Sequence, residues 1–283
     1  MATFFNQASL SYNGNTITSN ITTGEIVEVL SAQKTAVFPT YEQNGDVTYV
    51  ISIVNAGTTP YTNLTLTDNL GEYPFGSGTV VPFDYKTGSI RYFVNGVLQA
   101  TPTVASESPL TVTGINVPAN SNAIVVYEAT ANEFAPLASG STITNEAVIS
   151  GSGLTNPITV TETVDVNEAP DLSITKSLTP TIVNENGQIT YTMTILNSGN
   201  TPIVATDDVV VSDTFDPILS GITVTLNGAP LAVANYTYNE ATGEFATVAG
   251  VVTVPAATYT QNPVTGEWGT TPGTAIITVT GTI

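Results

Sequence analysis

Apolar and polar residues alternate with a period of two along much of the chain. The alternation is clear at residues 47–54, 63–67 and 209–212, which are rich in β-branched and aromatic side chains. Such segments bury one face and expose the other, and they are typical of β-strands. Turn pairs such as Asn44-Gly45 and Asn95-Gly96 lie between them. The pattern therefore predicts an all-β fold made of many short strands, as in β-sandwiches.

The chain contains an internal repeat. The spacing from Lys34 to Tyr49 equals the spacing from Lys176 to Tyr191. Further matches follow in the same order: Asn55 with Asn197, Asp68 with Asp213, Asn95-Gly96 with Asn227-Gly228, and Ala123 with Ala275. Self-similarity over such a distance indicates repeated structural units. We therefore expect two sandwiches in tandem.

These motifs resemble a bacterial surface repeat family known as domain of unknown function eleven. The resemblance rests on Lys34 at the first strand, Val-Thr-Tyr at 47–49, the Asn-x-Gly turn at 55–57, Thr-Asp-x-Leu at 67–70 and Thr-Asn-x-Ala-x-Ile at 144–149. It implies an immunoglobulin-like fold and a place on a cell or spore surface. In several branches of the family it also implies Lys–Asn isopeptide bonds within a domain. A chain with two such repeats resembles the ribbon-forming appendage proteins of endospores from anaerobic spore-formers.

The second repeat is expected to lack its closing strand. The first repeat ends with a strand at residues 144–150, but no matching segment follows residues 275–278. Residues 5–11 match 144–150 position by position, and residues 21–29 echo residues 160–166. The start of the chain therefore resembles the end of a sandwich. We predict that it supplies the strand that the second repeat lacks.

The expected organisation has three parts: an N-terminal donor arm at 1–30, a first sandwich at 31–169 and an incomplete second sandwich at 170–283. A sandwich without a strand has an unpaired edge, which an inserted extended segment can cover. The arm can enter its own chain's second repeat, enter that of a neighbour, or remain unpaired. We favour the neighbour, because a head-to-tail contact of this kind leads to an open filament. The donor strand would insert the side chains of Phe5, Ala8 and Leu10.

Two of the four cations in the chain occupy equivalent repeat positions, Lys34 and Lys176. A lysine buried among apolar side chains has a lowered pKa, and a neutral amine is a nucleophile. Asp68 and Asp213 also share a repeat position, and we expect them to act as proton relays. The two repeats therefore carry the same candidate Lys–Asp pair.

A carboxamide would complete each pair. Asn145 supplies it in the first repeat, and alignment places Asn6 at the matching position of the second. One interpretation is an isopeptide bond between Lys34 and Asn145, and between Lys176 and Asn6, with loss of ammonia. The other is a buried Lys–Asp salt bridge with the asparagine as a hydrogen-bonding neighbour. The family resemblance favours the bond.

The composition excludes several classes of function. The chain has 4 basic and 23 acidic residues, a net charge of −19, and no His or Cys. So few cations cannot neutralise a nucleic-acid backbone or dock on an anionic membrane. The absence of His and Cys excludes thiol nucleophiles, Ser-His-Asp triads and typical zinc sites. We expect no metal, no cofactor and no enzymatic activity apart from autocatalytic bond formation.

We predict a structural subunit of an extracellular fibre or spore appendage. Its main partner would be a second copy of itself, with other fibre or tip proteins as further partners. Residues 1–7 lack the basic and apolar regions of a Sec signal peptide, so we expect assembly inside a mother cell and release by lysis. The alternative is a monomeric adhesin or stalk module that binds host glycans or matrix.

Overall fold

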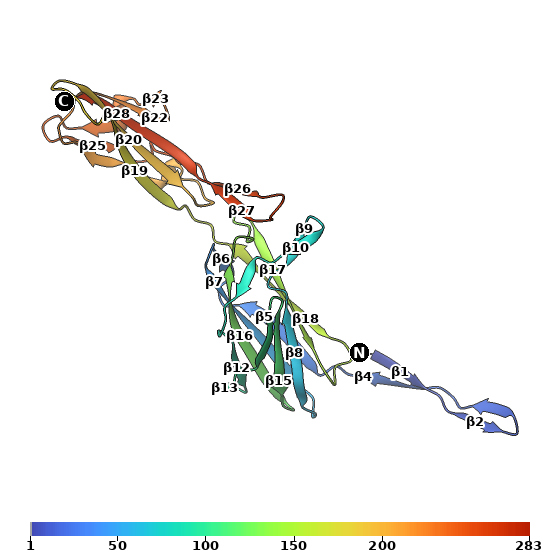
Figure 1. Ribbon diagram of the computed structural model, residues 1–283. Coiled ribbons are helices and arrows are strands. Elements are labelled where there is room, and N and C mark those ends of the chain that lie inside the picture. Colours follow the sequence, from blue (N-terminus) through green and yellow to red (C-terminus); the bar gives the residue numbers. More distant parts are fainter. Residues whose placement is uncertain (1) are drawn as a thin grey trace. The chain divides into compact units, whose positions relative to one another are not determined.

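The computed structural model describes residues 2–283, and the protein is all-β (Figure 1). Over these residues the regular elements are β-strands, apart from 3₁₀ turns at Ala205–Asp207 and Val233–Asn235. No helix within residues 2–283 is long and apolar enough to cross a membrane. The prediction of an all-β fold is confirmed.

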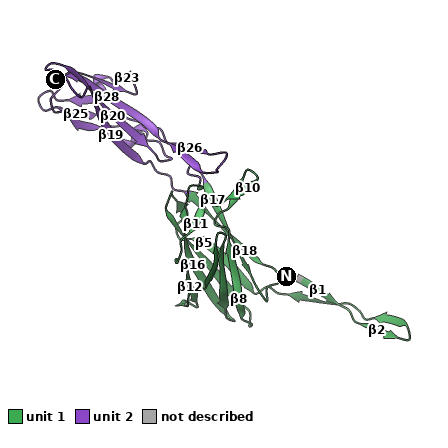
Figure 2. Ribbon diagram, in the orientation of Figure 1, with its two compact units in different colours: residues 1–135, 142–165 green, residues 136–141, 166–283 purple. Residues whose placement is uncertain are grey.

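The chain forms two compact units (Figure 2). The first contains the residues up to 135 together with 142–165, and the second contains 136–141 and 166–283. The sequence placed the boundary at residue 169. The structure differs, because the segment 136–141 and the end of the last strand of the first sandwich group with the second unit.

One sheet of the first sandwich has the strand order β13-β12-β16-β7-β5, and β11 also pairs with β16. All of these pairs are antiparallel. The long strands alternate fully buried side chains with mostly half-buried ones, as the sequence pattern predicts. The bounds are β5 (Leu30–Ala36), β7 (Asp46–Asn55), β11 (Phe83–Tyr85), β12 (Arg91–Val94), β13 (Val97–Leu98) and β16 (Ser121–Ala131).

The other sheet has the order β14-β15-β8-β17-β18-β6. Its central strands follow the immunoglobulin pattern, because β8 pairs with β17 and β17 pairs with β18, as strands C, F and G do in that fold. A separate hairpin is formed by β9 (Tyr73–Phe75) and β10 (Gly78–Val80). The bounds are β6 (Thr40–Tyr41), β8 (Tyr61–Asp68), β14 (Thr103–Glu107), β15 (Leu110–Val117), β17 (Thr142–Ser150) and β18 (Ile158–Val166).

The second unit repeats the first sheet of the first sandwich. Its order β19-β20-β28-β22-β23 corresponds to β5-β7-β16-β12-β13. The register agrees as well, because Tyr191 lies opposite Val279 where Tyr49 lies opposite Tyr127. The bounds are β19 (Leu172–Thr179), β20 (Gln188–Asn197), β22 (Ser220–Leu226), β23 (Ala229–Pro230) and β28 (Gly273–Thr282).

The second sheet of this unit is smaller. It contains β21 (Ser212–Thr214), β25 (Glu244–Thr247) and β24 (Tyr236–Tyr238) in that order. This matches β8, β15 and β14 of the first sandwich. Within residues 2–283, no strand pairs with β21 on the side where β17 pairs with β8. A further hairpin is formed by β26 (Thr258–Gln261) and β27 (Trp268–Thr271).

The strand expected at residues 209–212 is largely absent. Only Ser212–Thr214 forms a strand there, whereas its counterpart β8 spans Tyr61–Asp68. In the first sandwich β17 pairs with residues 65–68 of β8. Within residues 2–283 the corresponding segment of the second unit has no such neighbour, so its ladder does not extend toward residue 209.

The N-terminal arm is a two-stranded ribbon. β1 (Ala2–Asn6) pairs with β4 (Thr22–Ile26), and β2 (Ser9–Tyr12) pairs with β3 (Asn15–Thr18). The segment that the sequence predicted as a single donor strand is therefore one half of this ribbon. The partner strand β4 lies in the part that the sequence matched to residues 160–166, so by sequence the ribbon corresponds to the β17–β18 hairpin. Its register differs by one residue, because Asn6 lies opposite Thr22 whereas Asn145 lies opposite Glu162, the match of Thr23.

Candidate functional site

Lys34 and Asp68 form a fully buried ion pair in the first sandwich. The lysine lies on β5 and the aspartate at the end of β8, and Lys34 Nζ is 2.7 Å from Asp68 Oδ2. Neither side chain is exposed to solvent. The ammonium also lies 4.7 Å from the ring centroid of Tyr49, which gives it a cation–π contact. The structure thus brings together the two residues that the repeat predicted as a pair.

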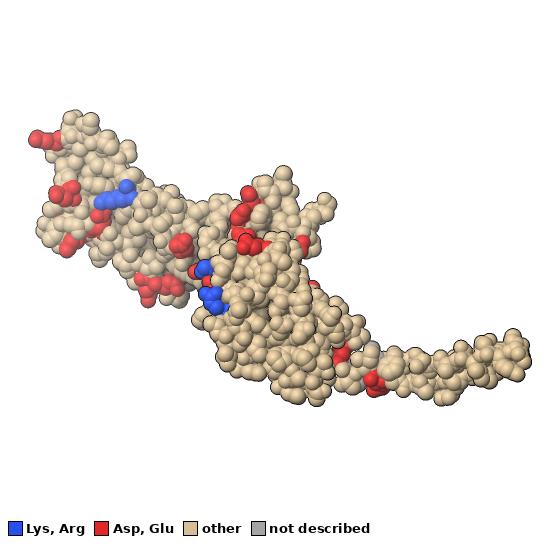
Figure 3. All heavy atoms as spheres, turned by 60° about the horizontal axis from the view of Figure 1, so that its bottom comes forward, with Lys and Arg blue, Asp and Glu red and all other residues tan. Residues whose placement is uncertain are grey.

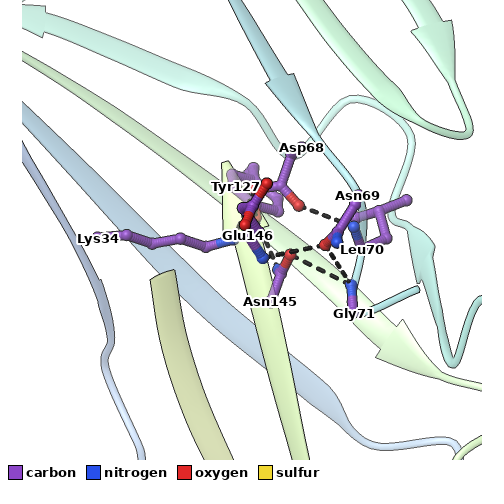
Figure 4. Close-up of polar contacts among 8 residues, drawn as sticks. All are labelled: Lys34, Asp68, Asn69, Leu70, Gly71, Tyr127, Asn145 and Glu146. Atoms are coloured by element: carbon purple, nitrogen blue, oxygen red, sulfur yellow. Dashed lines mark hydrogen bonds and ion pairs between the residues drawn. The ribbon is translucent and has the colours of Figure 1, made fainter. Parts of the chain in front are cut away.

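Asn145 joins this pair from β17 (Figure 4). Its side chain is fully buried. The amide nitrogen donates to the hydroxyl of Tyr127 at 3.2 Å, and that hydroxyl donates to Asp68 Oδ2 at 2.5 Å. In Figure 4 the end of the Lys34 side chain points toward the Asn145 amide. All three residues predicted for the first repeat therefore meet in one buried cluster.

Burial changes the chemistry of the lysine. Desolvation lowers the pKa of Lys34 to about 8, against the opposing attraction of Asp68, Glu162 and Glu146. A substantial fraction of the amine is therefore neutral at mildly alkaline pH. A neutral amine beside a carboxamide is a nucleophile beside an acyl group, which is the arrangement that amide exchange requires.

The loop after β8 holds the amide in place. Gly71 donates its backbone N–H to Asn145 Oδ1 at 3.2 Å, and Asn69 exchanges hydrogen bonds with the backbone of Glu146. Gly71 has φ +76°, and a Cβ there would lie 2.4 Å from the Ile143 side chain. Only glycine fits this left-handed and crowded position.

Sequence reasoning missed Tyr127 and Gly71. Tyr127 follows the apolar segment at residues 123–126, and no motif in the sequence singled it out. Gly71 directly follows the Thr-Asp-x-Leu motif, which was the one signal that pointed to it. Neither residue type, taken alone, distinguishes a site from ordinary packing.

The equivalent pair in the second unit is open. Lys176 and Asp213 form an ion pair, but their side chains are 41% and 17% exposed. Lys176 lies 4.4 Å from the ring centroid of Tyr191, as Lys34 lies beside Tyr49. The pair therefore has the same residue types as the first site, but its side chains remain partly exposed.

The rest of the inner face of β19 is also uncovered. Leu172 is 43% exposed although its counterpart Leu30 is buried, and Ile174 is 57% exposed. We call Leu172, Ile174 and Lys176 of β19, together with β21, the acceptor site. The first sandwich has β17 and β18 beside the corresponding strands, and this accounts for the difference.

The predicted donor residues lie on the ribbon. Asn6, Ala8 and Leu10 are exposed, with Leu10 at 61%. Their counterparts Asn145, Ala147 and Ile149 are buried in the first sandwich. Asn6 and Lys176 belong to different parts of the chain, and their pairing is a proposal for two copies.

Phe5 differs from the other donor residues. Its counterpart Thr144 is exposed, whereas the counterpart of Phe4 is the buried Ile143. Phe4 lies over Gly24, where a Cβ would fall 2.3 Å from the Phe4 ring. By strand alternation Phe4 shares a face with Asn6, and Phe5 points to the opposite face.

No protein-family model matches the chain, and no curated protein matches it. Among solved structures, BcpA, the major pilin subunit of Bacillus cereus, is similar at 14% identity and TM-score 0.38, covering 75% of this chain and 69% of that chain. The pilus backbone RrgB from Streptococcus pneumoniae is similar at 14% identity and TM-score 0.36, and the match covers 86% of this chain and 55% of RrgB. A family 123 glycoside hydrolase from Clostridium perfringens is similar at 12% identity and TM-score 0.32, and the match covers 49% of this chain and 27% of the hydrolase. The chain therefore spans about a quarter of the hydrolase and about half of RrgB, and similarity this distant carries no argument about function.

Proposed function

We propose that the protein is a structural subunit of an extracellular fibre, in which the N-terminal ribbon of one copy completes the second unit of the next copy. The observation that carries this proposal is a complementary pair of features in one chain. Within the described residues the second unit has no counterpart of the β17–β18 hairpin, and the ribbon corresponds to that hairpin.

The acceptor site supports the proposal by its exposed groups. β21 has one unpaired edge within residues 2–283, and such an edge is a template for another strand. Leu172 and Ile174 expose apolar surface beside it. A hairpin docked there would pair with the β21 edge and bury both side chains, as β-strand addition does in other complexes.

The donor ribbon supports it by its composition. Glu25 is the one charged side chain in residues 2–26. Figure 3 shows the ribbon almost entirely in tan, whereas acidic groups are scattered over other parts of the face in view. An almost uncharged ribbon can approach another copy of a chain of net charge −19 with little repulsion. Its exposed apolar side chains include Phe4, Leu10, Tyr12, Ile17 and Ile26.

The first sandwich supplies the register of docking. There Ala147 lies opposite Asp68, and Ile149 lies opposite Leu66. The same register would place Ala8 opposite Asp213 of the next copy. Leu10 would then fill the position of the buried Ile149, and Asn6 would lie where Asn145 lies beside its lysine.

The places where the chain enters and leaves the first sandwich favour docking of the ribbon on a second copy over docking on its own chain. Residues 26–32 and 153–158 line one pocket, so the ribbon leaves the sandwich beside the start of β18. The chain passes on toward the second unit at the end of β18, roughly 26 Å along the strand from Ile158. A ribbon that leaves at the opposite end is suited to an open, head-to-tail contact.

Covalent bonds belong to the proposal. Lys34 and Asn145 would form an isopeptide bond within each subunit, with Asp68 as the proton relay. Lys176 and Asn6 of two copies would form a second bond at each junction, with Asp213 in the same role. Strand pairing would set the geometry and the amide bonds would prevent dissociation, as a surface or spore appendage requires.

Electron microscopy of the full-length chain tests the proposal. The wild type should form fibres, and Leu10→Asp should remain monomeric, because a carboxylate would enter the position of the buried Ile149. Gln7→Glu is the matched control and should form fibres, since it adds a carboxylate where its counterpart Glu146 is an exposed carboxylate. Both changes lie on the exposed ribbon, so neither disturbs the folded units. Dispersed wild-type monomers would support the adhesin alternative, and normal fibres from Leu10→Asp would exclude ribbon donation.

A further inference from the structure

Both ends of the Asn145 carboxamide are held by hydrogen bonds. Gly71 N–H donates to the oxygen at 3.2 Å, and the nitrogen donates to the Tyr127 hydroxyl at 3.2 Å. The first contact would stabilise negative charge on the oxygen if the carbonyl carbon were attacked. The second lies at the nitrogen that would leave as ammonia.

Tyr127 connects this leaving nitrogen to the carboxylate. Its hydroxyl donates to Asp68 Oδ2, the same oxygen that accepts from Lys34 Nζ. The ring is fully buried and stacks on Tyr49 at 5.5 Å between centroids. Burial and the neighbouring Asp68 raise the pKa of Tyr127 well above its usual value, so the hydroxyl stays protonated and can both accept and donate.

We propose that Tyr127 is a catalytic residue for the Lys34–Asn145 bond, and that it passes a proton from Asp68 to the departing Asn145 nitrogen. The inference rests on the proposed isopeptide bond and assigns the path of its proton. In the resting cluster the hydrogen bonds run from Asn145 through Tyr127 to Asp68. They reverse once Asp68 has taken a proton from Lys34.

The step balances without any further reactant. Lys34 transfers a proton to Asp68, and its neutral amine attacks the Asn145 carbonyl carbon to form the new C–N bond. Asp68 donates its proton to the Tyr127 oxygen while Tyr127 donates its own to the Asn145 nitrogen, whose bond to carbon breaks. The Asp68 carboxylate freed in this way takes the extra proton of the attacking nitrogen, so that one proton enters and one leaves the relay. The products are one secondary amide and one ammonia.

The second unit lacks this relay. Val279 lies opposite Tyr191 where Tyr127 lies opposite Tyr49, so no hydroxyl occupies that position beside Lys176 and Asp213. The bond within the first sandwich should therefore form faster than the bond at a junction between copies. Each subunit would be locked internally first, while a misplaced ribbon could still leave an acceptor site.

Time-resolved intact mass of freshly translated full-length chain tests the relay. The wild type should lose one ammonia as it folds, and Tyr127→Phe should slow this loss by about 100-fold or more, the usual size of a general acid contribution. Tyr85→Phe is the matched control and should react at the wild-type rate, because its buried hydroxyl makes no hydrogen bond within the described residues. Near-ultraviolet circular dichroism checks that each variant folds.

Two results would overturn the relay. One is a folded Tyr127→Phe chain that reacts at the wild-type rate. The other is a wild-type rate that is equal in H₂O and D₂O, a measurement that holds even if the variant fails to fold. A wild-type chain that never loses ammonia would instead refute the bond itself, so the two failures are distinguishable.

Discussion

Lys34 and Lys176 occupy the same position in two repeats, yet the side chain of Lys34 is fully buried and that of Lys176 is 41% exposed. Both face an aspartate and a tyrosine ring. What differs is the pair of strands that covers the first lysine. Under the proposed docking, the exposure of Lys176 therefore reports whether a ribbon occupies the acceptor site.

Chemical labelling of Lys176 should therefore differ between monomers and fibres. In monomers an amine-reactive acylating reagent should modify Lys176, and in fibres it should not, because docking buries the amine or converts it to an amide. Lys86 is the internal control, since it is 49% exposed and should react in both states. Peptide mapping by mass spectrometry measures each site. Equal modification of Lys176 in monomers and fibres would contradict docking at this site.

The internal bond predicts a change in mass. Full-length monomer should be lighter than its sequence mass by one ammonia, and Asp68→Ala should restore the full mass because Lys34 loses its proton acceptor. Asp46→Ala removes the carboxylate of an exposed Lys86 ion pair and should leave the ammonia loss unchanged. Because removing one partner of a buried pair costs about 3–5 kcal/mol, Asn145→Ala serves as a second variant that keeps the pair. Full sequence mass in the wild type would exclude the bond.

The lowered pKa of Lys34 predicts a pH dependence of stability in the unbonded chain. Asn145→Ala keeps the lysine free, with a folded pKa of about 8 against an unfolded value of 10.5. Between these values the unfolded chain binds more protons than the folded chain, so the free energy of unfolding rises with pH. The full difference corresponds to about 3 kcal/mol. It is present above pH 10.5 and is lost as the pH falls through 8.

Urea unfolding of Asn145→Ala at pH values from 7 to 10 measures this rise. The bonded wild type is the control, because an amide nitrogen does not titrate in this range. A stability of Asn145→Ala that stays flat or falls over the same window would show that Lys34 is not desolvated as the structure indicates.

The sequence was sufficient for the fold class because the alternation in strands such as β7 and β16 is almost unbroken. It was also sufficient to propose Lys34, Asp68 and Asn145 as one cluster, since the repeat singles out the Lys–Asp pair and the family pattern adds the asparagine. It failed at residues 209–211, where three valines form no strand and, within residues 2–283, have no counterpart of β17 to complete a ladder. Local propensity cannot report a missing partner.

The ribbon illustrates the same limit. Alignment identified residues 5–11 and 21–29 with two strands of the first sandwich, but not that they pair with each other as a free hairpin. Alignment also does not give side-chain direction, and Phe5 was expected on the inner face that strand alternation assigns to Phe4. The proposed role of Tyr127 could not be predicted from the sequence, because it depends on hydrogen bonds among residues of four strands.

The junction bond gives the most demanding prediction. If Asn6 of one copy docks beside Lys176 of the next, Asn6→Ala should still assemble, because main-chain pairing and the apolar contacts of Leu10 remain. Its fibres should fall to monomers on boiling in detergent, whereas wild-type fibres should persist. Asn20→Ala is the matched control on the same ribbon and should give fibres that survive boiling.

Tandem mass spectrometry of digested wild-type fibres identifies the bond directly. A branched peptide joining Lys176 to Asn6 is expected, and it should be absent from Asn6→Ala. It should also appear later than the Lys34–Asn145 branch, because Val279 provides no hydroxyl to protonate the leaving nitrogen. A branch from Lys176 to an asparagine of its own unit, or wild-type fibres that boil apart, would eliminate the covalent junction. Ribbon docking would then rest on strand pairing alone, and the exposed Lys176–Asp213 pair would be a salt bridge that docking covers.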